Sequence, residues 1–207
     1  AWMHTGLSYL QMGNTKGAQM AFQQASDITE GNASVREEAL YNYALTLHEG
    51  ASAGFGQSVS VMERFMNDYP QSQYSDKVSG YLTEVYFTTK NYKAALESIE
   101  KISRPNAEIL QAKQRVLYNL GVQDFTQGNY ANALNYANQS VALGKRDAAV
   151  YQATYYLKGE SEYMLGNFAA AARDLKQAQP NDNATYSLGY ALFKQKKYEE
   201  ALPQFEG

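Results

Sequence analysis

The chain has 207 residues, of which 44% are hydrophobic and 19% are charged, and its formal net charge is −3. The hydrophobic fraction is enough to bury a core and argues against an intrinsically disordered chain. The acidic balance and the lack of a basic stripe argue against a nucleic-acid partner. There is no cysteine, which excludes disulfides, thiolate metal sites and a cysteine nucleophile.

The residue types favour helices. Only four prolines are present, and Ala, Leu, Gln, Lys and Glu are frequent, which favours helix over strand. No apolar run approaches the roughly 20 residues that a membrane-spanning helix needs. We therefore expect an all-α fold without a membrane span.

The predicted elements begin with a helix pair at the N-terminus. The first helix carries the small residue Gly6 and ends at Gly13-Asn14, a dipeptide typical of left-handed helix ends. The second helix carries the small residue Ala18 and then the large apolar residue Phe22. One small residue on each helix lets the two backbones approach closely. We expect Phe22 to fill the space against the next helix pair.

This pattern recurs along the chain. The second helices start near Thr15, Phe55, Tyr92, Tyr130, Phe168 and Tyr198, at intervals of 40, 37, 38, 38 and 30 residues. The small residues are Gly6, Ala44, Thr83, Gly121, Gly159 and Gly189 on first helices, and Ala18, Ser58, Ala95, Ala133, Ala171 and Ala201 on second helices. A period in the thirties with two helices per repeat predicts a stacked array of helical hairpins.

The residues of the first repeat resemble the tetratricopeptide-repeat (TPR) family. Its Trp…Gly…Tyr…Ala…Phe…Ala pattern is matched by Trp2, Gly6, Tyr9, Ala18, Phe22 and Ala25, with Thr5 where leucine is usual. The resemblance implies an all-α, right-handed superhelical solenoid of antiparallel helix pairs. It covers 1–207 as one domain, with repeats near 1–32, 33–72, 73–109, 110–147, 148–181 and, in part, 182–207.

The later repeats depart from this pattern at two places. Gly50 to Gly56 reads as a lengthened turn. Lys158, Glu162 and Asp124 occupy positions where other repeats place apolar residues. We expect these charges to be satisfied by a Lys158–Glu162 pair one helical turn apart, or by a Lys158–Asp124 pair between repeats.

No constellation of residues indicates chemistry. The two histidines, His4 and His48, have no second histidine or cysteine nearby to complete a metal site. Gly54-Phe55-Gly56 follows no predicted strand and precedes no Gly-Lys-Ser/Thr, so it is not a phosphate loop. We expect no catalytic residues, no bound metal and no cofactor.

A stripe of residues on the first helices is the candidate site. In TPR proteins this stripe, one step round from the core face, faces the concave groove. The candidate groove residues are Tyr41, Asn42, Tyr81, Glu84, Tyr118, Asn119, Tyr156, Glu160, Tyr186 and Tyr190. Tyrosine suits recognition of a peptide, and the alternative is that these rings pack between neighbouring first helices. The stripe lacks the Lys/Arg pair with which some family members clamp a C-terminal carboxylate.

The resemblance implies a protein-interaction scaffold that binds a protein or peptide partner and performs no catalysis. The alternatives are a spacer in a long repeat array and a groove for a small ligand or glycan. The chain starts and stops inside repeats without polar caps, so we expect a fragment of a longer protein whose ends are open to self-association. Tyr69–Ser72 and Tyr155–Glu160 resemble segments of bacterial cell-envelope members of the family, which implies the periplasm or cell envelope, with the cytoplasm as the alternative.

Overall fold

The computed structural model describes residues 1–28, 30–50 and 55–206. Within these ranges the chain forms twelve α-helices and no strand. They are α1 (Trp2–Gln11), α2 (Thr15–Asp27), α3 (Ala33–Gly50), α4 (Gln57–Asp68), α5 (Ser75–Thr89), α6 (Tyr92–Glu100), α7 (Ala107–Thr126), α8 (Tyr130–Ala142), α9 (Ala148–Met164), α10 (Phe168–Gln177), α11 (Asp182–Lys194) and α12 (Tyr198–Glu206). The expected all-α fold is confirmed. The turn expected at Gly50–Gly56 lies mostly outside the described residues.

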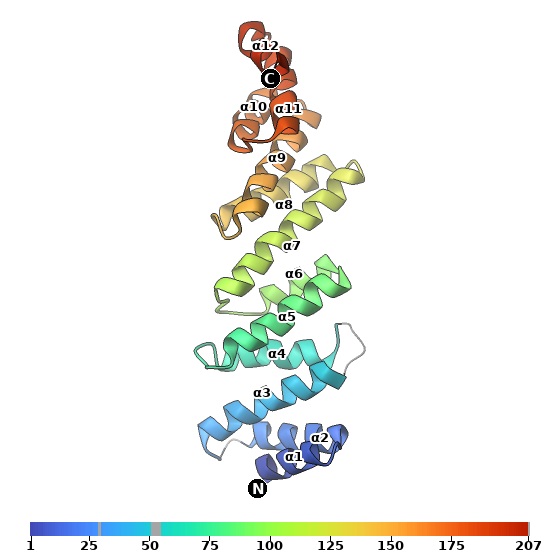
Figure 1. The fold of residues 1–207 in the computed structure, drawn as a ribbon, viewed down its shortest axis with the longest axis vertical. Coiled ribbons are helices and arrows are strands. Elements are labelled where there is room, and N and C mark those ends of the chain that lie inside the picture. Colours follow the sequence, from blue (N-terminus) through green and yellow to red (C-terminus); the bar gives the residue numbers. More distant parts are fainter. Residues whose placement is uncertain (29, 51–54, 207) are drawn as a thin grey trace. The chain divides into compact units, whose positions relative to one another are not determined.

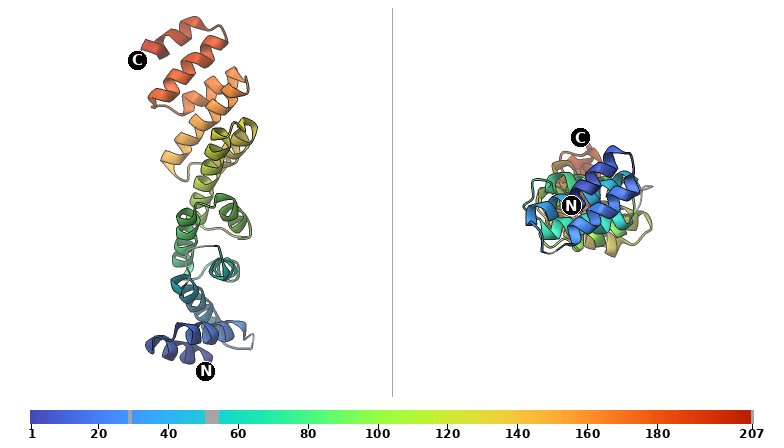
Figure 2. Two further views of the ribbon diagram at one scale, coloured as in Figure 1. Left: turned by 90° about the vertical axis from the view of Figure 1, so that its right-hand side faces the viewer. Right: turned by 90° about the horizontal axis from the view of Figure 1, so that it is seen from below.

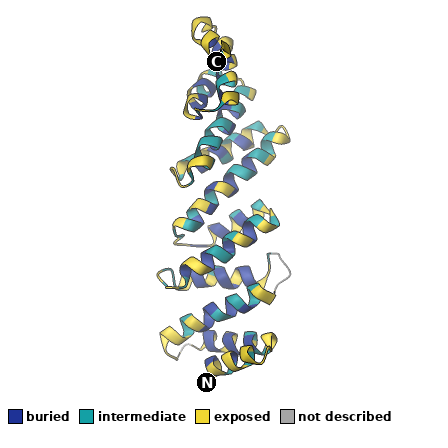
Figure 3. Ribbon diagram, viewed as in Figure 1, coloured by how far each residue is buried: buried dark blue, intermediate teal, exposed yellow. Residues whose placement is uncertain are grey.

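The helices belong to two units, Ala1–Ile109 and Leu110–Gly207. Within each unit, helices that follow one another in sequence pack side by side as antiparallel hairpins (Figures 1 and 2). In the first unit α2 contacts α1 and α3, and in the second unit α10 contacts α9 and α11. The buried residues lie on the helix faces that meet their neighbours, and the outward faces are exposed (Figure 3). Of the helices in the described residues, none is both long enough and apolar enough to cross a membrane.

Glycines end three of the first helices as the sequence predicts. Gly13, Gly128 and Gly166 have φ angles of 71°, 81° and 82°, a left-handed conformation that disfavours other residues. The asparagine after each glycine donates its backbone N–H to a carbonyl five residues back, over 2.8 Å in all three turns. At the corresponding turns of α5 and α11, Lys90 and Lys196 adopt φ angles of 53° and 61°, at a cost of about 1 kcal/mol each.

Glycines also set the closeness of the two helices in a pair. A Cβ atom on Gly159 of α9 would lie 2.5 Å from Leu175 of α10, and one on Gly189 would lie 2.6 Å from the ring of Phe205. Gly6 and Phe22 meet in the same way. The large residues therefore cover the glycine of their own pair, whereas the sequence-based expectation placed them against the next pair. Close packing of this kind leaves little room for an added methyl group.

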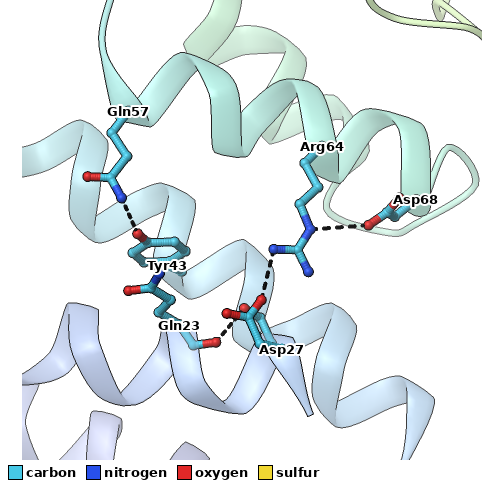
Figure 4. A network of polar contacts seen from close by, with 7 residues as sticks. Gln23, Asp27, Tyr43, Gln57, Arg64 and Asp68 are labelled. Atoms are coloured by element: carbon cyan, nitrogen blue, oxygen red, sulfur yellow. Dashed lines mark hydrogen bonds and ion pairs between the residues drawn. The ribbon is translucent and has the colours of Figure 1, made fainter. Parts of the chain in front are cut away.

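A polar network links the hairpins of the first unit (Figure 4). Arg64 on α4 lies 3.0 Å from Asp27 on α2 and 3.4 Å from Asp68 on its own helix. The Gln57 side chain donates a hydrogen bond of 2.6 Å to the hydroxyl of Tyr43 on α3. The ion pairs are solvent-exposed, so each contributes less than about 1 kcal/mol. They link α2 and α4 at the surface and add little to the stability of the fold.

A buried glutamine fixes the connection between α8 and α9 in the second unit. The amide nitrogen of Gln114 donates to the carbonyl of Ser140 at 2.9 Å and to that of Gly144 at 2.6 Å. Its amide oxygen accepts from the backbone N–H of Asp147 at 2.9 Å. Gln152, one repeat later, donates in the same way to the carbonyl of Ala178 at 2.9 Å. These two glutamines were not predicted as functional or structural residues, although the interval of 38 residues between them equals the repeat period and is a usable signal.

The charged cluster of the second unit differs from the expected pairs. Lys158 Nζ lies 3.0 Å from Asp174 Oδ2 on α10, and Arg173 Nε lies 3.3 Å from Asp174 Oδ1. The expected Lys158–Glu162 and Lys158–Asp124 ion pairs are wrong. Glu162 is only 5% exposed and lies beside Asp174. The sequence pattern could not reveal this arrangement, because Asp174 lies on the second helix of the pair, where the repeat predicts only packing residues.

Candidate functional site

In the first unit, Tyr41 is buried in a ring stack. Its ring lies face to face with that of Tyr74, the residue before α5, with 4.3 Å between the centroids and 8° between the planes. Only 8% of Tyr41 is exposed. Asn42 is half-buried, and its amide donates a hydrogen bond of 2.8 Å to the carbonyl of Glu38 on the same helix. Tyr41 and Asn42 are therefore engaged in contacts within the first unit.

Tyr81 and Glu84 of α5 also have partners within the first unit. His48 of α3 stacks on Tyr81 with 4.7 Å between the centroids, and its Nε2 lies 3.5 Å from Glu84 Oε2. Burial, followed by the neighbouring Tyr41, raises the pKa of the Tyr81 hydroxyl. His48, which the sequence did not single out for the stripe, therefore contacts both Tyr81 and Glu84, and Glu84 remains 65% exposed.

In the second unit, Tyr118 and Asn119 lie on α7 and are half-buried. The Asn119 amide donates a hydrogen bond of 2.8 Å to the carbonyl of Arg115 on its own helix. Neither residue lines the pocket that the structure forms further along this unit.

The stripe opens into a pocket between α9 and α11. We call this the α9–α11 pocket; its volume is about 270 Å³. It is lined by Glu160, Tyr163, Met164, Tyr186, Ser187 and Tyr190. Three of the predicted groove residues, Glu160, Tyr186 and Tyr190, thus meet at one site. The sequence analysis missed Tyr163, Met164 and Ser187, although Tyr163 follows Tyr156 at a helical spacing of seven residues.

The tyrosine rings of the pocket are held in place from behind. Tyr186 and Tyr190, one helical turn apart on α11, meet edge to face at 5.3 Å. Both rings also contact Phe205 of α12, at 5.4 Å and 5.3 Å. Despite this support, Tyr186 is 53% exposed and Tyr190 is 44% exposed. The site therefore offers aromatic surface to solvent on rings whose orientation is fixed by packing.

Polar groups lie beside these rings. Tyr156, the fourth predicted residue of this face, interacts with Glu160 and with the Ser187 hydroxyl; burial, and then the Glu160 charge, raise the pKa of Tyr156. A hydrogen bond with the Tyr186 hydroxyl raises the pKa of Tyr190. Glu160 is half-buried, and within the described part of the chain it forms no hydrogen bond or ion pair. The pocket wall thus combines apolar rings with one unpaired carboxylate.

Among the described residues, no group of three or more histidine, aspartate or glutamate side chains is placed to hold a metal ion. The chemistry that the pocket residues offer is recognition: stacking, hydrogen bonding and charge.

Comparisons with known proteins agree with the fold. Two family profiles described as tetratricopeptide repeat match residues 1–27 and 156–207, and the second range contains the α9–α11 pocket. A comparison with curated proteins gives no match. Among solved structures, the apo form of RapI is similar at 12% identity and a TM-score of 0.50, over 99% of this chain and 74% of that chain.

Two further solved structures align at lower similarity. PilF of Pseudomonas aeruginosa aligns at 15% identity and a TM-score of 0.45, over 98% of this chain and 86% of that chain. The TPR2AB domain of yeast Sti1, solved in complex with pHSP90, aligns at 15% identity and a TM-score of 0.41, over 99% of this chain and 87% of that chain. The two profile matches identify tetratricopeptide repeats at residues 1–27 and 156–207, and the glycine-packed helix pairs within these ranges agree with that identification.

Proposed function

We propose that the chain is a protein-interaction scaffold that binds a segment of a partner protein at the α9–α11 pocket and performs no catalysis. One observation carries the proposal: the rings of Tyr186 and Tyr190 remain about half exposed, although Phe205 fixes them from behind. Exposed rings with little conformational freedom are the residues that contribute most to protein recognition, because little entropy is lost when they bind.

The pocket size favours a partner segment over a free small ligand. A volume of about 270 Å³ lies at the lower end of the roughly 300–1,000 Å³ that is typical of small-molecule sites. It accommodates one large side chain, which can anchor a longer peptide that continues along the surface of α9 and α11. The binding role is therefore proposed for Tyr156, Glu160, Tyr186 and Tyr190, with Tyr163 and Ser187 in support.

The stripe of the first unit is proposed to act differently. Tyr41 and Tyr81 are stacked on Tyr74 and His48, so their rings are already covered by aromatic partners. We assign Tyr41, Asn42 and Tyr81 to packing between α3 and α5, and we assign Glu84, whose side chain is 65% exposed, to the ion pair with His48. The tyrosines of the first unit then serve packing, and those of the second unit serve recognition.

The proposal is tested with a display library of random 12-residue peptides selected on the chain. Tyr186→Ala is expected to weaken the selected peptides at least about tenfold, since an aromatic hot spot contributes about 1–2 kcal/mol or more. Tyr198→Ala is the matched control, because Tyr198 is also exposed, at 55%, and also contacts a neighbouring ring, Phe193.

The expected result requires that both variants keep the helical circular dichroism spectrum. If no selected peptide distinguishes Tyr186→Ala from Tyr198→Ala, the pocket is not the binding site. The spacer role is then the better description of this part of the chain.

A bacterial cell-envelope or periplasmic location is also proposed. Its support is the resemblance of Tyr69–Ser72 and Tyr155–Glu160 to segments of envelope members of the family. Fractionation of the native cell tests it, and recovery of the protein in the cytoplasmic fraction would contradict it.

A further inference from the structure

Glu160 gives the α9–α11 pocket a negative charge, and among the residues that the structure describes no basic side chain forms an ion pair with it. Glu160 is the only residue with a carboxyl side chain among the six that line the pocket. It is half-buried and lies next to the hydroxyl-bearing ring of Tyr156. A carboxylate without a partner can accept charge-assisted hydrogen bonds from a cation.

The basic residues nearest in sequence are engaged elsewhere or lie at the end of the helix. Lys158, two residues before Glu160, lies 3.0 Å from Asp174 on α10, and Arg173 pairs with the same carboxylate. Lys194, one turn after Tyr190, is exposed in the last turn of α11. The pocket wall itself contains no basic side chain.

The aromatic residues of the pocket favour the same charge. The faces of tyrosine rings carry partial negative charge and attract a cation within about 6 Å. Tyr163, Tyr186 and Tyr190 line the pocket together with Glu160. An anionic side chain would be repelled by this wall, and a neutral apolar side chain would bury Glu160 without a partner.

We propose that the α9–α11 pocket binds the side chain of an arginine or lysine from the partner segment, with the Glu160 carboxylate accepting its hydrogen bonds and the tyrosine rings enclosing it. Arginine fits best, because its planar guanidinium stacks on aromatic rings and donates two parallel hydrogen bonds to a carboxylate. This inference rests on the proposed function, since it specifies which chemistry the same pocket recognises.

The test uses the peptides selected on the wild-type chain and replaces each arginine or lysine in turn with norleucine. One such replacement is expected to weaken binding to the wild-type chain about tenfold. For Glu160→Gln the same replacement is expected to cost at most about twofold, because the carboxylate that distinguished the two peptides is gone. Glu206→Gln, which removes an exposed charge of α12, should retain the tenfold difference.

The outcomes separate the two proposals. If the peptides are sensitive to Tyr186→Ala but tolerate norleucine at every basic position, the proposed function stands and the cation site is wrong. If no peptide is sensitive to Tyr186→Ala, both are wrong. The norleucine comparison on the wild-type chain is decisive even if Glu160→Gln folds poorly.

Discussion

Replacing Gln114 with methionine is expected to destabilise the second unit by about 3 kcal/mol. Methionine has a similar volume, so the packing of α7 is retained and the loss comes from hydrogen bonding. The carbonyls of Ser140 and Gly144 and the N–H of Asp147 lose the amide that now joins them. Gln114 is fully buried, and water does not replace these bonds without local opening of the connection between α8 and α9.

Chemical denaturation and amide hydrogen exchange measure this effect. Gln139→Met on α8 is the control, because Gln139 is exposed and the same substitution there should change stability by less than about 0.5 kcal/mol. Exchange of the Asp147 amide should accelerate in Gln114→Met more than that of amides in α11. Equal denaturation midpoints for the two variants would show that the amide clamp does not hold this connection.

Replacing Glu162 with glutamine is expected to stabilise the second unit above pH 7 by on the order of 2–3 kcal/mol. Burial, followed by the neighbouring charge of Asp174, raises the pKa of Glu162 to about 7. Burial also opposes ionisation of Asp174, but hydrogen bonds from Arg173 and Lys158 lower its pKa. At neutral pH the folded unit therefore contains a carboxylic acid that has begun to ionise next to a carboxylate.

The sign of the pH dependence follows from the raised pKa. The unfolded chain loses the Glu162 proton near pH 4.5, whereas the folded chain retains it until about pH 7. The contribution of this group to stability is complete below pH 4.5 and is lost as the pH rises to about 7. The glutamine side chain does not ionise, and its amide can still donate a hydrogen bond to Asp174. The stability of the variant should therefore not decline between pH 4.5 and pH 7.

Thermal unfolding between pH 5 and pH 8 checks the prediction. Glu199→Gln, which removes an exposed charge from α12, should show the same decline as the wild-type chain. A decline of the same size in Glu162→Gln would assign the pH dependence to other groups.

Local features of the fold could be predicted from the sequence because they depend on a few adjacent residues. Gly13-Asn14 and its later copies predicted the left-handed turns, and the recurring small residues predicted the closeness of the paired helices. The spacing of four residues between Tyr186 and Tyr190 also predicted that both lie on one face of their helix. These inferences need only backbone geometry within one hairpin.

Interactions between hairpins could not be predicted in the same way. The sequence shows that Tyr41 and Tyr186 occupy equivalent positions, yet Tyr41 is covered by Tyr74 and Tyr186 is exposed. Tyr74 comes from the connection before α5, where the repeat pattern assigns no packing role. The partner of Lys158 could not be predicted for a similar reason. Asp174 lies on a second helix, and the repeat pattern predicts small residues on that helix but no charged ones.

The claim that the α9–α11 pocket is the binding surface is tested most directly by nuclear magnetic resonance. A selected peptide is titrated into the 15N-labelled chain while the backbone amide shifts are followed. We predict that the largest changes occur at Glu160, Tyr163, Ser187 and Tyr190, on facing helices. Large changes confined to α8 or α12, with these four amides unchanged, would contradict it.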